Sequence, residues 1–134
     1  MKLLIGPLEK AIARLEEGWD RYRRDVSDTQ IRDGLIQRFE FVYELSHKTI
    51  KRYLEQASAS PEQFDTIPFS DLIRTANEMG LLLGDWPAWR LYREMRNQTS
   101  HAYDEEIARQ VVEGIPAFIR EARFLRDHLK ERLP

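Results

Sequence analysis

A group of polar side chains able to act on a phosphate lies in the last third of the sequence. The segment REMRNQTSHAYDEEIA brings Arg96, Asn97, His101 and Tyr103 within eight positions. Arginine carries a permanent charge suited to phosphate contacts, and histidine titrates near neutral pH. The segment is therefore a candidate site for binding or cleaving a phosphodiester.

The chemistry that this set suits needs neither a metal nor a cofactor. His101 can move the proton of a ribose 2′-hydroxyl or of the leaving oxygen, while Arg96 stabilises charge that develops on the phosphate. Asn97 can orient either group. Arg90 and Arg93 precede Arg96 at spacings of three on one helical face, so they are candidate RNA or phosphate contacts. The alternative for these two arginines is a solvated face paired with acids.

The spacing of Arg96 and His101 requires a turn between them. On one continuous helix their side chains would project about 140° apart and would not meet. QTSHAYD is rich in capping residues, and Asp104 with two following glutamates predicts a new helix start. If the preceding helix ends near Thr99, His101 and Tyr103 lie in a turn and can fold back toward Arg96.

Other chemistries have little support in the sequence. The three histidines, His47, His101 and His128, lie far apart without partners at metal-ligand spacing, so no metal site is predicted. Ser100 adjoins His101, but adjacent side chains point in different directions. The chain has no cysteine, which excludes thiolate nucleophiles and disulfides. We expect His47 to pack at a helix interface and His128 to have a structural role.

Hydrophobic spacing predicts an all-α fold, an antiparallel up-and-down bundle of four to five helices in one domain spanning residues 1–134. A proline-containing linker, ASASPEQFDTIPFSD, follows the long second helix, and Ser60 is expected to cap a short helical turn within it. The predicted helices are a first over residues 8–22, a second over 29–56, a third over 69–79, a fourth starting after Asp85 and a fifth starting after Asp104.

Composition points to a cytoplasmic protein without a membrane partner. The net charge is −2 with 33% charged residues, unlike the frankly basic domains that coat nucleic acids. No run of about 18 apolar residues is present. The N-terminal MKLLIGPLEK is too short and too soon charged for a signal peptide.

The residues of the polar segment carry a family resemblance. RNQTSHAY resembles the arginine–polar–x3–histidine–x–tyrosine signature of the HEPN superfamily. Together with RFEFVYELSHKTIKRYLE and SHAYDEEIA, it resembles small bacterial HEPN proteins encoded beside minimal nucleotidyltransferases, often named nucleotidyltransferase substrate-binding proteins. The resemblance extends from the first helix to about Leu133. It departs from relatives at His47, where tryptophan is frequent, and in the long linker.

The resemblance implies a HEPN-like bundle that forms a homodimer, with the signatures of two subunits facing one cleft. It implies a metal-independent endoribonuclease of the HEPN/MNT toxin–antitoxin type, with Arg96 and His101 as the catalytic pair and Asn97 in support. It further implies that a cognate minimal nucleotidyltransferase antitoxin attaches AMP to Tyr103. The added nucleotide would bring negative charge and bulk into a phosphate site.

A second hypothesis uses the same residues without catalysis. In it the protein is the nucleotide- or substrate-binding subunit of a two-component nucleotidyltransferase, because phosphate binding and phosphate cleavage require similar side chains. A structural adaptor is the third and least favoured. The intact Arg–Asn–His–Tyr set favours the ribonuclease, whereas the modest overall acidity means that RNA affinity must come from a local basic patch.

Overall fold

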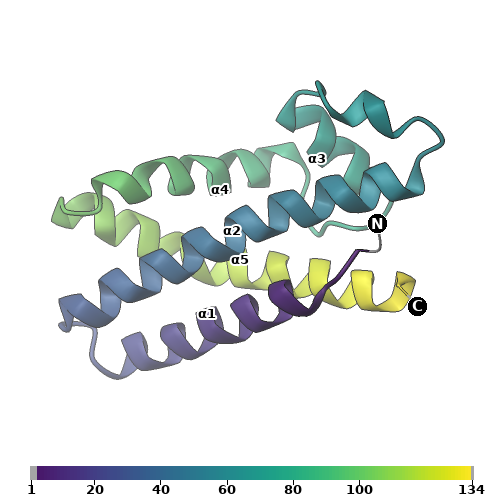
Figure 1. Cartoon of the computed structure of the whole chain (residues 1–134). Helices are drawn as coiled ribbons and strands as arrows, with labels where there is room; N and C mark the ends of the chain where they lie inside the picture. The colour runs from purple at the N-terminus through teal and green to yellow at the C-terminus, as the bar shows by residue number, and fades with distance from the viewer. Residues whose placement is uncertain (1–2, 134) are drawn as a thin grey trace.

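Five α-helices build the protein, as seen in a computed structural model that describes residues 3–133 (Figure 1). No β-strand occurs in this range. The predicted all-α, up-and-down bundle is confirmed. The helices are α1 (Gly6–Arg24), α2 (Thr29–Ala57), α3 (Phe69–Glu78), α4 (Trp86–Gln98) and α5 (Glu105–Arg132), with 3₁₀ turns η1 (Pro61–Phe64) and η2 (Thr99–His101).

Aspartate caps start the three helices that matter for the site. Asp28, Asp85 and Asp104 precede α2, α4 and α5. The side chains of Asp28 and Asp104 each accept from two backbone N–H groups of the first turn, and that of Asp85 accepts from the N–H of Trp86. Such a cap satisfies donors that the helix itself leaves unpaired. The starts of α4 and α5 that the sequence predicts from Asp85 and Asp104 are therefore confirmed.

The linker after α2 differs in one detail from the prediction. A helical turn forms at η1, but Ser60 makes no side-chain cap there. Instead, the hydroxyl of Ser58 accepts from the Ser60 backbone N–H at 3.0 Å and from Gln63 Nε2 at 2.8 Å. Ser58 lies at the end of α2, so its hydroxyl reaches both donors from outside the turn.

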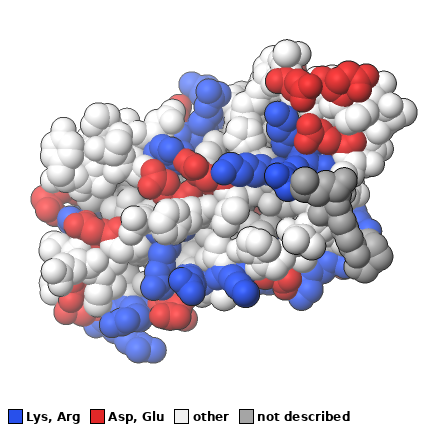
Figure 2. Space-filling model, in the orientation of Figure 1, with Lys and Arg blue, Asp and Glu red and all other residues white. Residues whose placement is uncertain are grey.

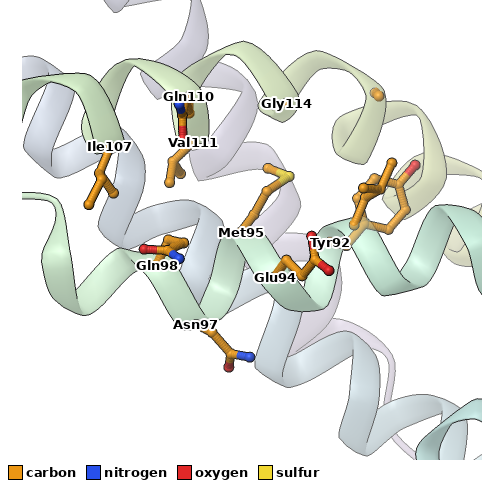
Figure 3. Close-up of a pocket in the computed structure, with 11 residues that line it drawn as sticks. Tyr92, Glu94, Met95, Asn97, Gln98, Ile107, Gln110, Val111 and Gly114 are labelled. Carbon is orange, nitrogen blue, oxygen red and sulfur yellow. The ribbon is translucent and has the colours of Figure 1, made fainter.

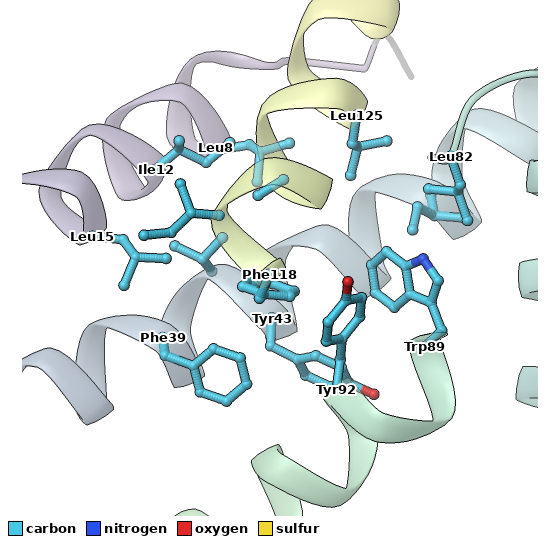
Figure 4. Packing of buried hydrophobic residues seen from close by; sticks show 14 of the residues in the cluster. Leu8, Ile12, Leu15, Phe39, Tyr43, Leu82, Trp89, Tyr92, Phe118 and Leu125 are labelled. Atoms are coloured by element: carbon cyan, nitrogen blue, oxygen red, sulfur yellow. The ribbon is translucent and has the colours of Figure 1, made fainter. Parts of the chain in front are cut away.

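The core gathers aromatic side chains from three helices at the centre of the bundle (Figure 4). The rings of Phe39 on α2 and Phe118 on α5 meet edge to face, with centroids 4.9 Å apart. Trp89 and Tyr92 of α4 also pack against Phe118, and burial raises the pKa of Tyr92 to about 12. These contacts hold α4 against α2 and α5, and so fix where α4 ends.

Candidate functional site

The polar segment forms the turn that joins α4 to α5. The backbone leaves α4 after Gln98, passes through η2 and enters α5 at Asp104. The hydroxyl of Thr99 donates to the carbonyl of Arg96 at 2.7 Å, which satisfies one of the last carbonyls of α4. The predicted break between Arg96 and His101 is therefore confirmed. We call residues 96–103 the signature turn.

Two glutamates on α2 hold the first residue of this turn. Arg96 donates from Nε and Nη2 to Oε1 of Glu44 at 2.8 and 2.5 Å. Its Nη1 lies 3.6 Å from Oε2 of Glu40, and the same oxygen accepts from the Thr99 hydroxyl at 3.0 Å. The hydrogen bond to Glu44 raises the pKa of Arg96. Arg96 is thus oriented by α2 while about a third of its side chain stays exposed.

Sequence reasoning did not single out Glu40 and Glu44. The available signal was their spacing of four within the second helix, which puts both carboxylates on one face. That spacing is common in solvated helices, so it does not reveal an arginine partner by itself. Only the packing of α4 against α2 identifies the pair as the support of Arg96.

His101 and Tyr103 stand exposed beyond Arg96. Their rings lie edge to face with centroids 6.3 Å apart, and Tyr103 is 84% exposed. The hydrogen bonds and ion pairs of Arg96 are made with Glu44 and Glu40 of α2. The structure thus brings His101 and Tyr103 together on one turn. The closer approach of His101 to Arg96 stays a prediction.

A groove of about 360 Å³ opens beside Arg96 between α2, α3 and α4. Arg93 lines this Arg96 groove, with its guanidinium 5.6 Å from the centre of the Phe69 ring, and Asn97 lines it as well. Arg90 lies outside it and pairs with Glu94 at 3.5 Å. The structure therefore gathers Arg93, Arg96 and Asn97 around one hollow and leaves Arg90 apart.

A second, apolar groove of about 490 Å³ separates α4 from α5 (Figure 3). Met95, Ile107 and Val111 line it, whereas Asn97 points away from α5. Gly114 lets Met95 sit close, since a Cβ there would meet the methionine sulfur at 2.5 Å. The apolar groove runs up to the signature turn, because Asn97 and Gln98 form part of its wall.

A third groove, of about 610 Å³, lies beside Tyr103 between α2 and the start of α5. Its charged lining is Arg32 together with Asp33, Glu40 and Glu105. Arg32 donates to Glu105 at 2.5 Å and lies 3.1 Å from Asp33. The pairing with Arg32 lowers the pKa of Glu105. Tyr103 therefore lies at the edge of a polar groove whose wall includes the Arg32 guanidinium.

The other two histidines pack against aromatic rings, and His47 also lines the Arg96 groove. His47 is half-buried with its ring 4.5 Å from that of Phe69, and burial lowers its pKa. His128 stacks on Phe124 with centroids 3.8 Å apart and has Nδ1 2.9 Å from the Phe124 carbonyl. Across residues 3–133, no group of three His, Asp or Glu side chains could hold a metal ion. No helix in that range is long and apolar enough to cross a membrane.

Comparison with known proteins identifies the family of the chain. Residues 3–131 match the family described as nucleotidyltransferase substrate binding protein like. The chain belongs to this family. The resemblance to the HEPN nucleotidyltransferase substrate-binding proteins, predicted from the signature and the second helix, is confirmed.

Individual relatives of the family are similar over nearly the whole chain. A Haemophilus influenzae protein named "Probable ribonuclease HepT" is 42% identical over 127 residues, which cover 93% of this chain and 86% of the relative. A solved H. influenzae structure, described as the fold of a substrate-binding domain of a nucleotidyltransferase, superposes with a TM-score of 0.88 at 37% identity, covering 95% of this chain and 99% of the other. A Thermus thermophilus structure gives a TM-score of 0.73 at 29% identity, covering 91% and 98%.

Proposed function

We propose that this protein is the toxin of a HEPN/MNT toxin–antitoxin pair and cleaves RNA in the cytoplasm as a metal-independent endoribonuclease. The observation that carries the proposal is the signature turn. Glu44 orients Arg96 beside an open groove, and His101 and Tyr103 are exposed immediately after it. The relative named a probable ribonuclease supports the same class of activity.

The proposed reaction is transfer within the RNA chain. The ribose 2′-oxygen attacks the phosphorus, the bond from phosphorus to the 5′-oxygen breaks, and a cyclic phosphate and a 5′-hydroxyl result. Neutral His101 accepts the 2′-hydroxyl proton, and a protonated histidine gives a proton to the leaving 5′-oxygen. Arg96 stabilises the charge on the phosphate through Nη1, which Glu44 does not engage and which exchanges its partly exposed 3.6 Å contact with Glu40 for the phosphate. Asn97 supports the pair from the groove wall.

The need for an acid and a base supports a homodimer. One chain supplies a single histidine at the signature turn, whereas two turns facing one cleft supply both groups. The apolar groove is the surface that we propose the second copy covers. It adjoins the signature turn, and Leu91 in its wall is 59% exposed, so apolar surface continues from the groove to the outside of α4.

Sedimentation analysis of Leu91→Glu tests this surface. A charge at the covered position should shift the protein to the monomer and remove RNA cleavage, while Leu4→Glu, at a 70% exposed leucine before α1, should leave both unchanged. A Leu91→Glu protein that remains a fully active dimer would place the second copy elsewhere.

RNA cleavage and growth arrest by wild type, His101→Ala and Arg96→Ala test the catalytic assignment. Loss of proton transfer or of charge stabilisation should reduce the cleavage rate by about 100-fold or more. His128→Ala is the matched control, because its ring packs on Phe124 away from the turn. An inert wild type that behaves like both variants contradicts the proposal.

Tyr103 is the proposed control point of the toxin. Its exposed hydroxyl attacks the α-phosphorus of ATP held by the partner nucleotidyltransferase, forming a tyrosine–AMP phosphodiester and releasing pyrophosphate. The exposure of 84% supports access by a partner enzyme. Mass spectrometry after co-expression with a cognate nucleotidyltransferase should find the AMP adduct on Tyr103 and none on Tyr103→Phe; an unmodified tyrosine in an inactive complex contradicts the switch.

The second candidate is a non-catalytic subunit that binds nucleotide or substrate for a two-component nucleotidyltransferase. The net charge of −2 favours it, since one nucleotide needs fewer cations than an RNA chain. Titration with ATP separates the candidates. The subunit should bind ATP through Arg93 and Arg96 and leave RNA intact, whereas the toxin should cleave RNA without added ATP.

A further inference from the structure

We propose that single-stranded RNA extends from the signature turn across α2 into a basic groove between α1 and α2, where Phe41 stacks on a base. The inference rests on the proposed ribonuclease function and assigns the substrate path outside the signature. This α1–α2 groove has a volume of about 660 Å³. Its α1 wall carries Lys10 and Arg14, and its α2 wall carries Phe41 and Lys48.

Two of the three arginines near the signature turn are already paired with acids. Arg96 is paired with Glu44, and Arg90 is paired with Glu94. Arg93 packs over the Phe69 ring. Because affinity for nucleic acid comes mainly from cations that neutralise phosphates, a chain with net charge −2 needs a further basic surface.

The α1–α2 groove provides that surface. Lys10, Arg14 and Lys48 are exposed, and within residues 3–133 none of them forms a side-chain ion pair. Arg38 lies in the same groove but donates to the Arg14 carbonyl at 2.8 Å. Three free cations thus line one hollow, and lysine and arginine side chains gather along the α1–α2 face (Figure 2).

Phe41 supplies a second kind of contact. Its ring is 53% exposed although it lies on the long central helix α2. Nucleobases of any sequence stack on such an aromatic face, and proteins that bind single strands combine stacking rings with a basic groove. One exposed ring among cations suits a nucleotide chain better than a protein helix, which needs a continuous apolar stripe.

The two hollows are connected across α2. Glu44 and Lys48 line both the α1–α2 groove and the Arg96 groove. Phe41 and Lys48 are two helical turns apart, about 10 Å along the axis. A few nucleotides therefore reach from a phosphate at Arg96, past Lys48, to a base on Phe41.

Binding of a labelled oligouridine of roughly 12 nucleotides, followed by fluorescence anisotropy, tests the path. The His101→Ala protein serves as the starting protein, so that the probe stays intact. Lys10→Glu/Lys48→Glu should weaken binding about tenfold or more and lower the salt slope by about 1.4, or about 0.7 for each lost phosphate contact. Phe41→Ala should weaken binding roughly five- to 100-fold.

Arg24→Glu/Arg120→Glu is the matched control, because it makes the same change in net charge at exposed arginines outside the groove. It should bind like the starting protein, and equal weakening in both double variants overturns the proposed path. If the groove variants cleave RNA as fast as wild type, the proposed RNA path is wrong and the ribonuclease proposal stands. If RNA binding depends on the groove but wild type cleaves no RNA, the ribonuclease proposal is wrong and the path stands. If the groove variants still bind RNA but no longer bind the partner nucleotidyltransferase, the groove is a protein-docking surface and the proposed path is wrong.

Discussion

A glutamate from another helix binds hydrogen-bond donors at each end of α4. One of these glutamates is buried and the other is partly exposed to solvent. At the start of α4, Glu121 of α5 is fully buried and accepts from the backbone N–H groups of Leu83 and Gly84, both at 2.8 Å. At its end, Glu44 of α2 binds Arg96, and the two side chains are 44% and 32% exposed.

The difference in solvent access separates a structural contact from one available for chemistry. Burial raises the pKa of Glu121, while the two backbone donors act against that rise, and removal of a buried acceptor strands donors that water cannot reach. A half-exposed ion pair contributes at most about 1 kcal/mol. Arg96 can therefore exchange Glu44 for a phosphate at small cost, whereas Glu121 has no such freedom.

The largest expected effect comes from removal of the buried glutamate. Glu121→Ala should lower the free energy of unfolding by about 3 kcal/mol, because the N–H groups of Leu83 and Gly84 lose their acceptor and a cavity remains. Urea unfolding measures the loss. Glu131→Ala, at an exposed position of α5, should stay within about 0.5 kcal/mol. Equal stabilities for the two variants would remove the contrast between the ends of α4.

A smaller loss is expected from crowding of the same buried corner. Gly84→Ala introduces a Cβ 2.8 Å from that of Ala88 and 2.9 Å from Oε1 of Glu121, which should cost about 2 kcal/mol in thermal unfolding. Gly34→Ala is the control, since nothing lies within 4 Å of its added Cβ. In the interior of α2 it should raise stability by up to about 1 kcal/mol. A neutral Gly84→Ala would mean that the Glu121 corner relaxes easily.

At the exposed end, removal of a charge should change binding more than stability. Glu44→Gln removes the charge of the closer of the two carboxylates that pair with Arg96. RNA affinity should therefore rise by up to about tenfold while the free energy of unfolding changes by less than about 1 kcal/mol. Anisotropy at low salt measures the gain. Glu55→Gln on the same helix lies outside the Arg96 groove and is the control for net charge. Weaker binding by Glu44→Gln would show that Glu44 positions Arg96 rather than competing with phosphate.

The smallest effect concerns pH. Because the pKa of His47 is lowered in the folded protein, the unfolded chain takes up a proton first as pH falls through about 6.5, and stability decreases there. His47→Phe keeps a ring against Phe69 and should lose less stability between about pH 7.5 and about pH 5.5. Parallel urea titrations of both proteins provide the comparison. An identical pH dependence would mean that His47 is solvated.

The helices and their starts could be predicted because local chemistry determines them. Residues three and four apart share a helical face, and Asp85 and Asp104 cap α4 and α5 through N–H groups one to three residues away. The cap predicted at Ser60 was wrong: the Ser58 hydroxyl, two residues earlier at the end of α2, accepts from Ser60 and Gln63 instead. Local sequence reasoning could not tell which of the two serines would accept these hydrogen bonds.

By itself, the sequence determined the helical elements, the turn between Arg96 and His101 and the residue types that can act on a phosphate. The tertiary structure alone decided that Arg96 binds Glu44, 52 residues earlier, that Arg90 stays outside the Arg96 groove, and that Glu121 is buried against a loop. Sixteen arginines and many acids allow far more pairings than one fold uses. Core packing among α2, α4 and α5 selects one set, because it fixes which helix faces approach each other.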